Sequence, residues 1–134
     1  MADREKNAAP ETDAEKLELL MGKALDYLLQ WLETQTPDSG HFKRSPVLFD
    51  IPGTRNVAFL EVQHHTTAPP AERSASVGVL RDGTDRMYSN FLMRGTKAEI
   101  LEYLRAGERK AMLESSVMRL SRNVDKYWRE EDGD

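Results

Sequence analysis

Residues 74–94, SASVGVLRDGTDRMYSNFLMR, decide the fold of this chain. Two apolar or alternating runs, 74–82 and 87–94, flank a turn-forming segment around Asp82-Gly83-Thr84. Runs of this length on either side of a short glycine-containing loop are typical of a β-hairpin. The stretch therefore predicts two adjacent antiparallel strands.

The apolar pattern also predicts the register of this hairpin. A three-residue loop pairs Val79 with Met87 and Ala75 with Phe91 on one face. A two-residue loop would instead set Val79 opposite Arg86. Because a shift of one residue moves a strand's side chains to the other face, the hydrophobic pattern favours the three-residue loop.

Two further runs upstream have the length and composition of strands. Residues 47–51 and 57–65 are short and apolar or alternating, and Pro52-Gly53 separates them. Ala68-Pro69-Pro70 separates the second run from the hairpin. Strands joined by such short breaks predict a four-stranded antiparallel meander.

Helical periodicity flanks the meander on both sides. From about residue 14 to residue 35, apolar residues recur at spacings of three and four and form one stripe of an amphipathic helix. A short helix is expected around 100–104, and a long one follows a break near Gly107. The apolar stripe of the long helix contains Leu113, Val117, Leu120, Val124 and Tyr127.

These elements predict an α+β fold: an N-terminal amphipathic helix, the meander, and two C-terminal helices packed on one sheet face. The stripe of the last helix could instead serve a partner helix. It spans only two heptads, fewer than a coiled coil needs, so we predict that it packs in the core.

Length and composition predict one domain with a tail at each end. A chain of 134 residues is the size of one ordinary domain. Residues 1–14 are small and charged, and we expect a disordered N-terminal tail. Residues 15–128 form the single domain, and 129–134 form an acidic C-terminal tail.

The composition excludes several kinds of chemistry. Without cysteine, the chain has no disulfides, no thiol catalysis and no thiolate metal site. Its apolar runs are too short to span a bilayer, and its first residues lack the apolar core of a signal peptide. We therefore expect a soluble cytoplasmic protein without a membrane partner.

The formal net charge of −4 makes nucleic acid an unfavoured partner, since phosphates repel an acidic protein. A nucleic-acid accessory domain would need a basic stripe on the last helix that Glu114 and Asp125 do not interrupt. The basic residues that could form it are Arg109, Lys110, Arg119, Arg122, Lys126 and Arg129.

Residues 92–101, LMRGTKAEIL, resemble a strand, a glycine and a helix start, an arrangement that can bind anions. Thr96 and Glu99 also fit a capping box, in which each side chain satisfies the other's backbone amide. A phosphate loop would contain more glycines, so we predict that the main role of this segment is to cap a helix.

A second candidate site follows from the meander topology, which brings alternate connections to the same end of a sheet. We expect positive charge to gather at this end of the sheet. The simpler interpretation is that Asp38, Glu61 and Glu72 neutralise this charge through ordinary surface ion pairs. The candidate ligand-binding residues at this end are His41, Lys43, Arg44, His64, His65, Arg94, Thr96 and Lys97.

Motifs for catalysis are lacking, and no cofactor is predicted. There is no Gly-x-Ser-x-Gly elbow, and adjacent strand residues such as His64 and His65 point to opposite faces, which disfavours a shared metal. We therefore predict a small non-catalytic binding or adaptor protein that acts through protein-protein contacts, with a homodimer as one form.

The alternative function is an anion or small-molecule binding domain that uses the positive end of the sheet. A flat apolar patch would favour a protein partner, whereas a deep pocket at the histidine end would favour a ligand.

Overall fold

The structure, a computed structural model, describes residues 12–34, 44–66, 72–84 and 87–131. Its elements follow one another in the predicted order. They are α2 (Asp13–Thr34), β1 (Arg44–Asp50), β2 (Asn56–Thr66), β3 (Glu72–Arg81), β4 (Met87–Gly95), α3 (Lys97–Arg105) and α4 (Arg109–Glu131).

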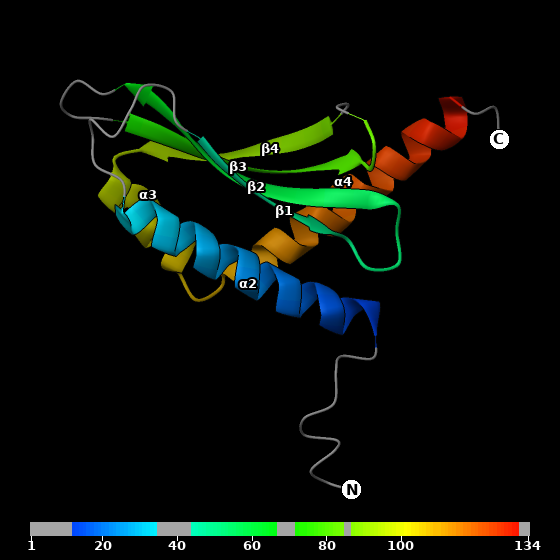
Figure 1. The fold of residues 1–134 in the computed structure, drawn as a ribbon, viewed down its shortest axis with the longest axis horizontal. Coiled ribbons are helices and arrows are strands. Elements are labelled where there is room, and N and C mark those ends of the chain that lie inside the picture. The colour runs from blue at the N-terminus through cyan, green and yellow to red at the C-terminus, as the bar shows by residue number, and fades with distance from the viewer. Residues whose placement is uncertain (1–11, 35–43, 67–71, 85–86, 132–134) are drawn as a thin grey trace, which may run out of the picture.

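The four described strands form one antiparallel sheet in the order β1-β2-β3-β4, a simple meander. Helices α2, α3 and α4 lie together on one face of this sheet (Figure 1). The predicted α+β fold, with helices on one sheet face, is confirmed. Among the described residues, no helix has the length and apolarity needed to cross a membrane.

The core lies between the sheet and the helices. On the sheet side, β2 and β3 pair Ala58 with Val79 and Leu60 with Val77, and all four side chains are buried. The helices bury their predicted apolar stripes against them, which confirms that the stripe of α4 packs in the core. The buried helical residues are Leu17, Met21, Ala24, Leu25, Leu28, Leu32, Ile100, Leu101, Leu104, Leu113, Val117, Leu120 and Val124.

A capping box that the sequence analysis missed starts α2. Thr12 N donates to Glu15 Oε1 over 3.1 Å, and Glu15 N donates to Thr12 Oγ1 over 3.1 Å. The helix therefore begins at Asp13, inside the predicted tail. At the other end, α4 continues to Glu131, past the predicted boundary at residue 128.

The predicted register of the β3–β4 hairpin is wrong by one residue. Leu80, not Val79, pairs with Met87, and Val79 pairs with Tyr88. The turn is tied differently from a three-residue loop: Thr84 N and Oγ1 both donate to the carbonyl of Arg81, over 3.1 and 3.0 Å. The shift moves Met87 away from the face that carries the buried Val79.

An irregularity in the same ladder limits the effect of this shift. Ser76 pairs with Phe91, whereas the preceding residue, Ala75, pairs with Met93. The β-bulge adds one residue to β4 and returns Met93 to the core side, where it packs against the buried cluster. The predicted pairing of Ala75 with Phe91 is therefore also wrong.

We predict that Leu120→Asp unfolds or severely destabilises the protein. Leu120 is 4% exposed at the centre of the α4 stripe, so the substitution buries an unpaired charge. Loss of a buried leucine typically costs about 2–5 kcal/mol. Met118→Asp is the matched control, because Met118 lies on the same helix and is 42% exposed.

Thermal unfolding followed by circular dichroism measures both variants. Met118→Asp should unfold close to the wild-type temperature. An unchanged unfolding temperature for Leu120→Asp would contradict the core assignment.

Candidate functional site

The backbone at the predicted positive end of the sheet is arranged as the topology requires. Arg44 pairs with Gln63, His64 with Arg73, and Arg73 with Gly95, so the four strands meet there. His65 lies between His64 and Thr66, at a shift in register. The side chains of Arg44, His64 and His65, and all of His41 and Lys43, lie outside the described residues.

Arg94 and Lys97, two candidate anion ligands at this end, are held by the protein itself. Arg94 Nε donates to Glu72 Oε1 over 3.0 Å, an ion pair of the kind expected on an ordinary surface. Lys97 Nζ donates to the backbone carbonyl of Glu33 over 2.9 Å and so ties the start of α3 to the end of α2. Both contacts compete with any anion for these cations.

Thr96 caps α3 as predicted. Glu99 N donates to Thr96 Oγ1 over 3.3 Å, and Thr96 N donates to Glu99 Oε1 over 2.8 Å. Gly95 gives this carboxylate its space, since a Cβ there would lie only 2.6 Å from Glu99 Oε1. The glycine in LMRGTKAEIL therefore serves the cap, and its role needs no phosphate.

Arg73 does not contribute to the surface charge at this end. Its side chain is buried, and burial lowers the pKa of its guanidinium. Glu61, which the sequence analysis placed among surface ion pairs, is also buried. Among the described residues of this end, one cation and one carboxylate that the sequence suggests for the surface are therefore buried.

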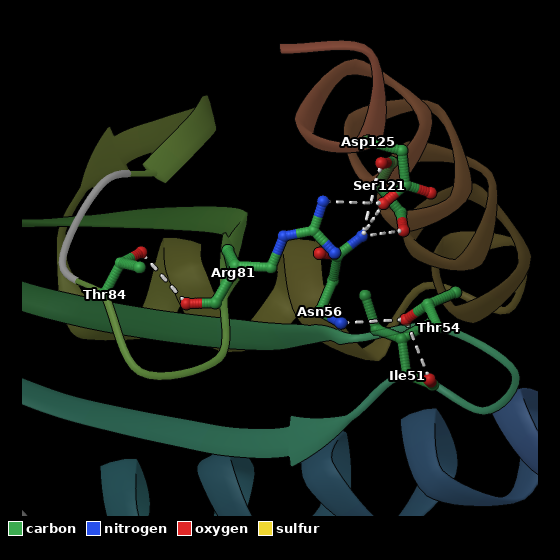
Figure 2. A network of polar contacts seen from close by, with 7 residues as sticks. All are labelled: Ile51, Thr54, Asn56, Arg81, Thr84, Ser121 and Asp125. Atoms are coloured by element: carbon green, nitrogen blue, oxygen red, sulfur yellow. Dashed lines mark hydrogen bonds and ion pairs between the residues drawn. The ribbon is translucent and has the colours of Figure 1, made fainter. Parts of the chain in front are cut away.

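A polar cluster lies at the opposite end of the sheet, where the turns are (Figure 2). Buried Asn56 of β2 donates through Nδ2 to Ser121 Oγ over 2.8 Å and to Asp125 Oδ1 over 2.9 Å. Arg81 of β3 approaches the same carboxylate at 3.7 Å, and its guanidinium lies 5.8 Å from the centre of the Trp128 ring. The cluster ties the C-terminal half of α4 to the sheet.

The bonding in this cluster indicates a structural role. Thr54 Oγ1 accepts from Asn56 N over 3.0 Å and donates to the carbonyl of Ile51 over 2.9 Å, which ties the β1–β2 turn to β2. Asn56 Oδ1 is the one atom of the cluster that is buried without a hydrogen-bond partner among the described residues. A buried amide that orients one helix adds specificity to the packing of α4.

The face of the sheet away from the helices carries the exposed apolar side chains. Leu48 of β1 is 56% exposed, and Met87 and Phe91 of β4 are 48% and 68% exposed. In the strand registers, Leu48 pairs with Phe59, Phe91 with Ser76, and Met87 with Leu80. Together with the β2–β3 register, these pairs place all six residues on the same face of the sheet. We call this surface, made of Leu48, Val57, Phe59, Leu80, Met87 and Phe91, the open face.

Phe59 forms the floor of the open face. Its register partner is Gly78, and a Cβ at Gly78 would lie 2.2 Å from Phe59 Cζ, so the ring lies directly over the glycine. Phe59 is only 6% exposed although it is on the face away from the helices. Leu48, Met87 and Phe91 therefore stand around an aromatic ring that is already packed.

A groove of about 750 Å³ lies elsewhere, between the start of α2, the β1–β2 turn and α4. Leu17, Ile51 and Met118 contribute apolar surface, and Arg119 and Arg122 contribute cations. Asp13 and Glu114 also line it, so its formal charges balance. This lining favours no particular ligand.

Two basic residues at the start of α4, Arg109 and Lys110, are held by partners within the protein. Lys110 Nζ donates to Glu18 and Glu114 over 3.2 Å each, and although desolvation lowers the pKa of Lys110, these two partners raise it overall. Arg109 donates to the carbonyl of Tyr103 over 2.9 Å and stacks on its ring. These intramolecular partners reduce the charge that α4 can offer to a phosphate backbone.

Comparison with known proteins gives no relative: no protein-family model, no curated protein and no solved structure matches this chain.

Sequence analysis missed Leu48, Met87 and Phe91 as site residues. It paired Met87 with Val79 and Phe91 with Ala75 on one face, because of the incorrect hairpin register. A signal was nevertheless present: residues 57–60 are apolar on both faces, with Val57 and Phe59 alternating with Ala58 and Leu60. A strand that is apolar on both faces indicates burial, or a partner, on both.

We expect Thr96→Ala to lower the free energy of unfolding by about 1 kcal/mol, because it removes the capping hydroxyl. The loss should be the same in phosphate and in chloride at matched ionic strength, measured by thermal melting. Arg94→Glu should change the midpoint little in either salt, because the pair it breaks is exposed. A phosphate-specific rise in midpoint that Arg94→Glu abolishes would instead support the anion site.

Proposed function

We propose that this chain is a non-catalytic protein-binding domain that holds an apolar surface of a partner protein against its open face. The observation that carries the proposal is the exposure of Leu48, Met87 and Phe91 on the sheet face opposite the helices. Large exposed apolar side chains gathered on one face often mark interaction sites. Large apolar and aromatic side chains such as Met and Phe are also enriched in protein interfaces.

The composition of the open face supports an apolar partner over a charged one. Between the exposed apolar residues lie Ser76, Gly78 and Ser89, and Asp50 and Arg94 lie at the margins. Glu61, which pairs with Ser76, is a charged residue within the face but is only 7% exposed. Full burial of a leucine, methionine or phenylalanine side chain contributes roughly 1.5–3 kcal/mol. A partner that covers Leu48, Met87 and Phe91 would therefore gain most of its affinity from apolar contacts.

The contacts at the histidine end also favour this proposal over anion binding. Arg94 is paired with Glu72, Lys97 with a backbone carbonyl, and Thr96 with Glu99. An anion would have to displace these partners to be bound there, whereas the open face needs no rearrangement to receive an apolar surface.

Site-specific photo-crosslinking tests this function. A benzoylphenylalanine residue at position 48 should capture a discrete partner in the host cell. The same residue at position 27 is the control, because Tyr27 is equally exposed, at 59%, but lies on α2. Mass spectrometry identifies the captured protein, which is then purified for titration calorimetry.

With the purified partner, Leu48→Asp should weaken binding by about tenfold or more, as expected for a residue central to an interface. Tyr27→Asp should bind like the wild type. Equal binding by wild type and Leu48→Asp, with both variants folded, would refute the role of the open face.

A further inference from the structure

By formal charge, the groove between the start of α2, the β1–β2 turn and α4 favours no ligand, but its charged residues differ in what they contact. Glu114 is already paired, because its Oε2 lies 3.2 Å from Lys110 Nζ. Asp13 lies in the first turn of α2, where the positive end of the helix offsets the charge of a carboxylate. Both acids of the groove therefore have a favourable neighbour within the protein.

The two arginines of the groove, Arg119 and Arg122, have no such neighbour. Neither guanidinium has a hydrogen-bond or ion-pair partner in the part of the chain that the structure describes, and both residues are exposed. They are three residues apart on α4, so their Cβ atoms lie about 5–6 Å apart on one side of the helix. Two adjacent guanidiniums without partners are suited to hold one anionic group between them.

The groove also has an apolar wall beside these arginines. Met118 lies one turn before Arg122 on α4 and is 42% exposed. Leu17 of α2 and Ile51, at the start of the β1–β2 turn, line the groove from its other sides. Its volume of about 750 Å³ lies within the range of roughly 300–1,000 Å³ that is typical of small-molecule sites.

We propose that this groove binds a small organic anion, with its anionic group between Arg119 and Arg122 and its apolar body against Met118. Charge complementarity gives the sign of the ligand, because the acids of the groove are offset within the protein and the arginines are not. An inorganic anion would leave the apolar wall uncovered. A neutral ligand would leave the two guanidiniums without a partner.

This site is separate from the proposed function. The groove is lined by α2, α4 and the β1–β2 turn, on the side of the sheet that the helices cover, and the open face lies on the opposite side (Figure 1). A ligand in the groove therefore leaves Leu48, Met87 and Phe91 free to contact a partner protein.

Two fluorescent probes with the same apolar body test the sign of the charge. Anilinonaphthalene sulfonate is an anion, and N-phenylnaphthylamine is its neutral counterpart. In fluorescence titrations of the purified full chain, the sulfonate should bind about tenfold or more tightly than the neutral amine, because only the sulfonate accepts hydrogen bonds from the guanidiniums. Methyl NMR of the same titration should show saturable shifts at Met118, with Met87 on the open face as the reference.

A double variant, Arg119→Gln with Arg122→Gln, tests the two guanidiniums. It should weaken binding of the sulfonate by about tenfold or more and leave binding of the neutral amine unchanged. Arg94→Gln with Arg105→Gln is the matched control. It has the same net charge, and both of its arginine side chains are 51% exposed, but neither lines this groove.

Met118→Asp tests the apolar wall and should weaken binding of both probes. Equal affinity of the wild type for the two probes overturns the site, and so does an equal loss of sulfonate binding in the two double variants. Saturable shifts at Met87 in place of Met118 would also overturn it. None of these results changes the crosslinking expected from position 48, so the two proposals can fail separately.

Discussion

The structure depends on one constraint: α2, α3 and α4 cover only one face of the sheet, while the other face carries the apolar side chains of Leu48, Phe59, Met87 and Phe91. On the covered face, Leu60 and Val77 are completely enclosed between the strands and the helices. On the other face, Phe59 is 6% exposed, and its ring lies over Gly78. The open face and the unpaired edge of β4 both follow from this arrangement, because nothing in the described part of the chain is left to cover them (Figure 1).

Most of the fold could be predicted from the sequence because its signals are local and repeated. The three- and four-residue spacing of apolar side chains gave both long helices, and proline and glycine marked the breaks between strands. The hairpin register could not be predicted, because Met87 makes an apolar pair with either Val79 or Leu80. Choosing between them depends on the turn at Gly83 and on the bulge beside Ala75, neither of which has a distinctive sequence.

The candidate site was less predictable because it depends on that register. The cap formed by Thr96 and Glu99 spans four residues and was predicted correctly. Meander topology also correctly brought the ends of β2, β3 and β4 together beside His64. An ion pair with Glu72 was expected there, although the sequence did not identify Arg94 as its partner. The contacts of Asn56 with Ser121 and Asp125 cross more than sixty residues of chain, and no local pattern reports them.

The central claim is that one face of the sheet is open, and methyl NMR with a soluble paramagnetic agent tests it most directly. The agent broadens methyl signals according to their access to solvent. The structure predicts strong broadening for Leu48 and Met87, and almost none for Leu60 and Val77 on the covered face. Protection of Leu48 and Met87 equal to that of Leu60 would contradict the account, because it would mean that the open face is already covered.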